Sequence, residues 1–124
     1  MGVTGLETAF AALHTALVVP GVLGLDLIVE RLSAGAAVYG LPLPSLTKGA
    51  LANLCLVDLE ARWTVGETGY QSRSENSCFA GATLQGKVLV TFAAGSVAYR
   101  DRGFSIRLAT DDRSSRLAGS REAG

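Results

Sequence analysis

The sequence predicts an α+β chain in which helices come first and strands follow. Three observations carry this prediction. Apolar residues recur at helical spacing over residues 6–17 and again over residues 25–32. Residues 87–92 alternate and are rich in β-branched side chains, as half-buried strands are. The sequence contains no internal repeat or low-complexity segment that would favour another architecture.

The first expected helix has Thr4 at its N-cap and Glu7 three residues on, which is the spacing of a capping box, and it ends at Pro20 and Gly21. Its apolar stripe consists of Leu6, Phe10, Leu13 and Leu17. A second helix is expected over residues 25–32, with Asp26 favourable in its first turn. A short third helix covers residues 34–39 and is closed by glycine and proline.

Beyond Pro44 the pattern changes to strands. Residues 53–59 and 62–65 predict two extended pieces, and residues 66–76 are polar and loop-like. A tight turn at residues 94–96 joins the strand over 87–92 to one over 97–100. Two amphipathic helices need a surface to cover, and these few strands offer little. The chain therefore looks like a piece that lacks a partner surface.

Composition excludes several classes of function. The 124 residues carry no net charge, and no basic patch is interleaved with aromatics, so neither nucleic acid nor an anionic membrane is an expected partner. No apolar run is long enough to span a membrane, and no signal peptide is recognised. The two cysteines, Cys55 and Cys78, match no zinc or thioredoxin spacing. A cytoplasmic location with reduced thiols is the default expectation.

A collinear series of short motifs covers residues 2–100. They are GVTGLETAF at 2–10, LSAGAAVYGL at 32–41, KGALANLCLVD at 48–58, WTV at 63–65, SRSENSCFAG at 72–81, LQGKV at 84–88 and GSVAY at 95–99. In this order and spacing the chain resembles the C-terminal part of dihydroorotases, in the amidohydrolase superfamily. The motif at residues 76–81 favours dihydroorotase over hydantoinase or allantoinase.

The resemblance implies a divided architecture. Residues 1–43 would be the last helices of a TIM-type barrel, and residues 44–100 the C-terminal share of a small composite β domain. Residues 101–124 match nothing in the family and hold nine of the chain's 22 charged residues. They are expected to form a disordered tail.

The resemblance also implies a reaction. Dihydroorotases catalyse the reversible cyclisation of N-carbamoyl-L-aspartate to dihydroorotate, in pyrimidine biosynthesis, with one or two zinc ions. The family's metal ligands cannot be placed here, because the chain has one histidine and no His-x-His pair. A zinc site needs three or four protein ligands, so the chain is expected to bind no zinc and to be inactive by itself.

One element of the family's substrate site can be matched. The main chain just before the first helix touches substrate in dihydroorotases, and the matching residue is Gly2, with Met1 where proline is usual. A glycine lets the main chain approach a ligand closely. Gly2 is therefore the one candidate substrate-binding residue.

The other polar residues are expected to be structural. His14 is interpreted as a packing or surface histidine, Asp58 as a turn former, and Asn76 as a residue that holds a loop. Cys55 is expected to be buried, and Cys78, which replaces a family proline, to be inert.

Several departures from the family weaken the expectation of activity: the missing proline near residues 35–36, Asn53 in place of aspartate, and Cys78. Three alternatives to a fragment of an active dihydroorotase stay open. The first is a non-catalytic dihydroorotase-like subunit that partners aspartate carbamoyltransferase or a second copy of itself. The second is an amidohydrolase of the dihydropyrimidinase or allantoinase type. The third is a small stand-alone interaction module, which its exposed helix stripes disfavour.

Overall fold

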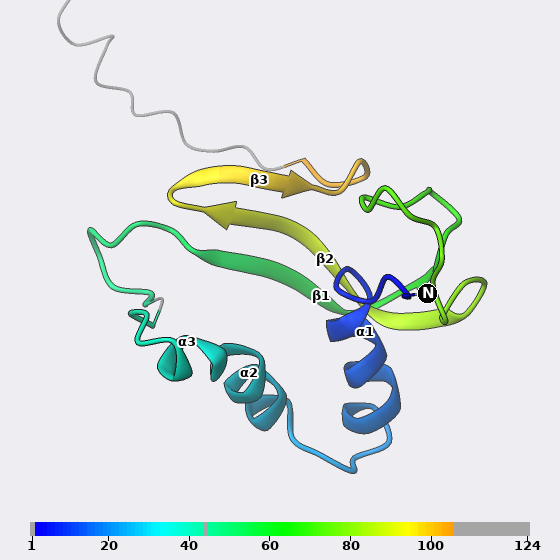
Figure 1. The fold of residues 1–124 in the computed structure, drawn as a ribbon, viewed down its shortest axis with the longest axis horizontal. Helices are drawn as coiled ribbons and strands as arrows, with labels where there is room; N and C mark the ends of the chain where they lie inside the picture. The colour runs from blue at the N-terminus through cyan, green and yellow to red at the C-terminus, as the bar shows by residue number, and fades with distance from the viewer. Residues whose placement is uncertain (1, 44, 106–124) are drawn as a thin grey trace, which may run out of the picture.

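The computed structural model describes residues 2–43 and 45–105. Helices come first along the chain and a three-stranded antiparallel sheet follows, so the expected α+β class is confirmed (Figure 1). Of the expected tail, residues 106–124 lie outside the described part. Within the described part, no helix combines the length and the apolar character needed to cross a membrane.

The first helix is shorter and less regular than its apolar stripe predicts. Helix α1 spans Ala9–Leu13 and continues as a π-helical turn, His14–Val18. The hydroxyl of Thr15 donates to the carbonyl of Ala11 at 2.7 Å and also reaches the carbonyl of Gln85 at 3.2 Å. The π-helical turn thus lies where α1 is tied to a strand 70 residues away, which local periodicity does not predict.

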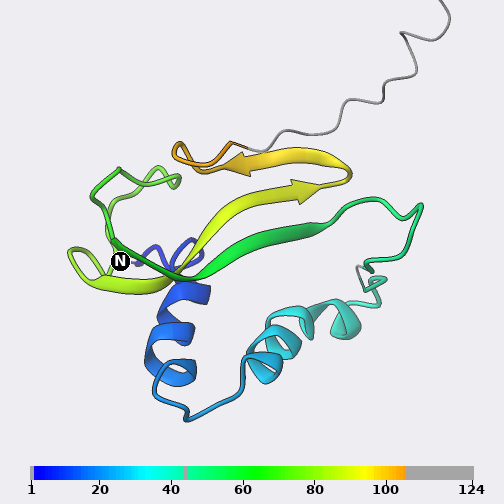
Figure 2. The same cartoon turned by 180° about the vertical axis from the view of Figure 1, so that it is seen from behind.

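Helices α2, Leu25–Ser33, and α3, Gly35–Val38, lie close to their expected positions. Gly24 is extended at the start of α2, and Asp26 lies in the first turn, where a carboxylate interacts favourably with the helix dipole. Figures 1 and 2 show both helices on the β1 side of the sheet, with β3 farthest from them.

The sheet has the order β1-β2-β3, from strands Leu54–Thr64, Thr83–Ala93 and Ser96–Arg100. The two extended pieces expected before residue 66 are one strand with an irregular register between Asp58 and Arg62. The expected hairpin turn is confirmed, since Ala94 and Gly95 have φ values of 49° and 80°.

The core is small for a chain of this length. Ala11, Val65 and Leu84 form one buried cluster, and half-buried side chains pack against it from Ala12, Trp63, Tyr70 and Phe79. Many large apolar side chains remain exposed, among them Leu6, Val29, Leu32, Val38, Leu41, Leu43, Leu46 and Leu51. The helices therefore bury only part of their apolar surface within the described residues.

Candidate functional site

Gly2 and the residues after it run beside the loop over residues 70–76 (Figure 1). The side-chain amide of Asn76 donates to the Gly2 carbonyl at 2.6 Å. The backbone N–H of Thr4 donates to the Asn76 carbonyl at 2.8 Å, and the Thr4 hydroxyl approaches the same oxygen at 3.3 Å. Asn76 thus forms hydrogen bonds through both its side chain and its backbone carbonyl to a segment more than 70 residues away. This confirms its expected role in holding a loop.

Glu7 makes a second tie between the same two segments. Its carboxylate accepts hydrogen bonds from the backbone N–H groups of Gln71, at 3.0 Å, and Ser72, at 3.3 Å. The capping box expected from Thr4 and Glu7 is therefore wrong. Helix α1 begins later, at Ala9, without a side-chain cap, because both residues use their polar groups on the distant loop. We call these hydrogen bonds, which Asn76 forms with Gly2 and Thr4, and Glu7 forms with Gln71 and Ser72, the clasp.

Burial raises the pKa of the Glu7 carboxyl, but the hydrogen bonds from Gln71 and Ser72 outweigh it and hold that pKa below its ordinary value. A carboxyl whose pKa is lower in the folded state stabilises the fold above its unfolded pKa, and loses that effect as the pH falls through the folded value.

We expect Glu7→Gln to remove part of the acid sensitivity of the chain. Between about pH 6 and pH 3.5 the unfolding free energy of the wild type should fall more steeply than that of the variant, because only the wild type must protonate the clasp carboxyl. Urea titrations at both pH values measure the difference. A residual slope should remain from Asp101, whose pKa is also lowered. Equal slopes in the two proteins would contradict the role given to Glu7.

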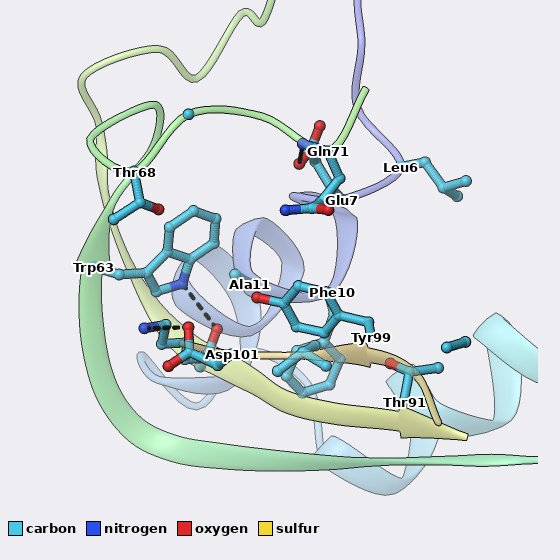
Figure 3. Close-up of a pocket in the computed structure, with 15 residues that line it drawn as sticks. Leu6, Glu7, Phe10, Ala11, Trp63, Thr68, Gln71, Thr91, Tyr99 and Asp101 are labelled. Carbon is cyan, nitrogen blue, oxygen red and sulfur yellow. Dashed lines mark hydrogen bonds and ion pairs between the residues drawn. The ribbon is translucent and has the colours of Figure 1, made fainter. Parts of the chain in front are cut away.

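A cavity of about 440 Å³ lies beside the clasp, between the start of α1, the loop over residues 66–72 and strands β2 and β3 (Figure 3). Phe10, Trp63 and Tyr99 supply much of its apolar wall. Lys87 and Asp101 form an ion pair at 2.8 Å on its lining. The hydrogen bond from Lys87 lowers the pKa of Asp101, whereas burial and the Asp101 charge raise that of Tyr99.

Each charged side chain that lines this cavity already forms an ion pair or a hydrogen bond within the described residues. Lys87 and Asp101 pair with each other, and Glu7 binds the loop amides. A general acid and base must be able to exchange protons with a substrate. The cavity therefore offers apolar contacts rather than an evident pair of proton-transfer groups.

His14 serves packing, as its sequence context suggests. It is 4% exposed, its ring stacks on Phe10 with centroids 5.7 Å apart, and its Nδ1 lies 3.3 Å from the carbonyl of Gln85. Within residues 2–43 and 45–105, no three His, Cys, Asp or Glu side chains come together as metal ligands. The described residues therefore do not fit a zinc site.

No protein-family model matches the chain. Over 100 residues the chain is 37% identical to the dihydroorotase of Shouchella clausii, 35% to that of Bacillus cereus strain B4264 and 34% to that of Bacillus thuringiensis strain Al Hakam. Each match covers 80% of this chain and 23% of the relative.

The chain is a partial dihydroorotase-like segment. It spans about a quarter of the length of the curated relatives it matches. The predicted resemblance is confirmed. Substrate binding by Gly2 stays a prediction. The clasp holds the main chain at that residue of the dihydroorotase-like segment.

Two smaller expectations for the dihydroorotase-like segment have different outcomes. Asp58 accepts hydrogen bonds from the N–H groups of Glu60 and Ala61, so its local backbone role is confirmed, although it shapes an irregularity within β1. Cys55 is exposed, so its expected burial is wrong: its side chain lines a groove between β1 and α2 that stays open. Both Cys55 and Cys78 are free thiols.

Two features of the site were not predicted from the sequence. Gly86 lies inside β2 with a φ of 94°, and its carbonyl accepts a hydrogen bond from the Trp63 indole at 3.1 Å. A glycine inside a strand pattern is the signal that could have indicated such a position. The pairing of Lys87 with Asp101 has no local sequence signal.

Proposed function

We propose that this dihydroorotase-like segment is part of a zinc-dependent dihydroorotase of the cytoplasm. That enzyme interconverts N-carbamoyl-L-aspartate and dihydroorotate in pyrimidine biosynthesis. Residues 1–43 contribute the last barrel helices, and residues 44–100 contribute the C-terminal strands of the small β domain. The segment supplies scaffold and the Gly2 main chain, while residues outside it supply the zinc ligands and the proton-transfer groups. By itself the 124-residue chain does not turn over dihydroorotate.

One observation carries the proposal: an apolar groove between α2 and β1 stays open in a chain that matches a quarter of a dihydroorotase. Its lining is mostly apolar and includes Leu25, Val29, Leu32, Leu43, Leu54, Cys55, Val57 and Leu59. Exposed apolar surface of this kind marks a contact with another element. In a barrel enzyme, strands and neighbouring helices from the rest of the chain would cover it.

The chemistry assigned to the segment is limited to substrate contact. Bound zinc would polarise the reacting carbonyl and activate water in the complete enzyme. The residues of this segment act at the edge of the substrate site. The clasp fixes the Gly2 peptide, which contacts the substrate through main-chain atoms. A glycine permits this close approach because no Cβ intervenes.

A chimera tests the proposal. The 100 matching residues of this chain replace their counterparts in the dihydroorotase of Shouchella clausii. We expect the chimera to hydrolyse dihydroorotate with a kcat/KM within about a hundredfold of the parent, a loss below about 3 kcal/mol of transition-state stabilisation.

Two controls accompany the chimera. The parent enzyme without the segment, and the 124-residue chain alone, should both lack turnover. A chimera that folds and binds zinc but does not turn over would contradict the proposed activity and favour a non-catalytic subunit. Turnover by the chain alone would contradict the assignment of the zinc ligands to other residues.

A further inference from the structure

We infer that Asn76 is a positioning residue for substrate binding: its side-chain amide holds the Gly2 carbonyl and so orients the main chain that meets the substrate. The inference rests on the proposed function, because only there does Gly2 contact a substrate. It concerns residues at opposite ends of the matched segment, 74 positions apart.

Packing does little to fix the segment that Asn76 holds. A Cβ added at Gly2 or Gly5 would meet no atom within 4 Å, so neither glycine is crowded by its surroundings. Val3 is 62% exposed and Leu6 is 94% exposed. Two glycines in such a segment give the backbone wide conformational freedom. Hydrogen bonds rather than sterics must therefore hold it, and the two shortest of them, at 2.6 and 2.8 Å, are made with Asn76.

The loop that carries Asn76 is itself restrained. The backbone N–H of Asn76 donates to the Ser74 hydroxyl at 3.2 Å, and Ser77 donates to the Glu75 carbonyl at 2.9 Å. The Glu7 carboxylate binds the start of the loop through Gln71 and Ser72. Asn76 thus holds Gly2 from a loop that is restrained by local hydrogen bonds and, at its start, by the Glu7 carboxylate.

The bond to Gly2 also sets the direction of a donor. The peptide between Gly2 and Val3 is planar, with its carbonyl and N–H on opposite edges. Because the carbonyl points at Asn76, the Val3 N–H points away from the clasp. Within the described residues that N–H has no hydrogen-bond acceptor. It is therefore available to an oxygen of an anionic substrate, such as the carboxylate of carbamoyl-aspartate.

Asn76→Asp tests the positioning role, because it keeps the shape of the side chain and replaces the donor by an oxygen. The carboxylate would face the Gly2 carbonyl, so the bond is lost and the two oxygens repel. In the 124-residue chain we expect exchange of the Thr4 amide proton, measured by nuclear magnetic resonance, to rise about tenfold or more. In the chimera we expect KM for dihydroorotate to rise about tenfold, with kcat within about threefold.

Asn53→Asp is the matched control. The Asn53 side-chain oxygen accepts a hydrogen bond from the Ala94 N–H at 2.8 Å, and aspartate keeps that acceptor. Thr4 exchange and KM should both stay at wild-type values. The preserved kcat of Asn76→Asp would show that the variant chimera folds.

The outcomes separate the inference from the proposed function. An active chimera whose KM is unchanged by Asn76→Asp overturns the positioning role and leaves the proposed function standing. Unchanged Thr4 exchange overturns the clasp itself. A wild-type chimera without activity contradicts the proposed function and, with it, the substrate role of Gly2.

Discussion

Gly86→Ala should destabilise the chain by about 3 kcal/mol, because the new methyl group adds both backbone strain and a tight steric contact. Gly86 has a φ of 94°, a conformation that costs a residue with a Cβ about 1–3 kcal/mol. The new Cβ would also lie 3.2 Å from both His14 Nδ1 and Phe10 Cε1. Those atoms belong to a stacked pair beneath β2, and the buried His14 side chain has little room to move.

Gly21→Ala is the control for Gly86→Ala. Gly21 also has a positive φ, 77°, but a Cβ there would meet nothing within 4 Å. Its substitution adds backbone strain alone, about 1 kcal/mol. Urea unfolding followed by fluorescence of Trp63, the single tryptophan, measures both variants. Equal losses at the two glycines would show that contact with His14 and Phe10 does not limit the space beside Gly86.

Leu32→Lys should have a small effect on the stability of the 124-residue chain and a large one on that of the chimera. In the 124-residue chain Leu32 is 51% exposed and lines the open groove, so a lysine there should change the unfolding free energy by less than about 0.5 kcal/mol. In the chimera the rest of the barrel would cover this face. A buried, unpaired ammonium group costs several kcal/mol, so the chimera should lose about 3 kcal/mol or more and most of its active enzyme.

Glu30→Lys is the matched control on the same helix. Its side chain is 67% exposed and lies two residues from Leu32, on a different face of α2. The chimera should tolerate this charge change. Thermal unfolding and zinc content of the two chimeras give the comparison. If Leu32→Lys is tolerated as well, the α2 face is not covered, and the assignment of α2 to a barrel wall is wrong.

The exposed apolar surface and the clasp have different roles in the proposed enzyme. The apolar surface concerns what the segment must pack against, and the clasp concerns what it presents to a substrate. Each depends on residues that are distant in sequence: the clasp joins residues 2–7 to residues 71–76. In the proposed enzyme, the loop over residues 71–76 would thereby stabilise the main chain proposed to contact the substrate.

The sequence by itself determined the kind and order of the elements, and it identified the resemblance to part of a dihydroorotase. Hydrophobic period, glycines and prolines predicted helices before residue 44 and the hairpin at residues 94–96, because these signals depend on neighbouring residues. The motif series identified the dihydroorotase-like segment, because its spacing is itself a property of the sequence.

Only the tertiary structure decided how particular polar and apolar groups are used. Glu7 and Thr4 do not cap a helix but form hydrogen bonds with a loop more than 60 residues away. His14 is buried against β2, and Cys55 is exposed. The physical reason is that a hydrogen-bonding group takes whichever partner the packed chain brings within about 3 Å. Spacing along the sequence does not specify that partner when the two segments meet through tertiary contacts.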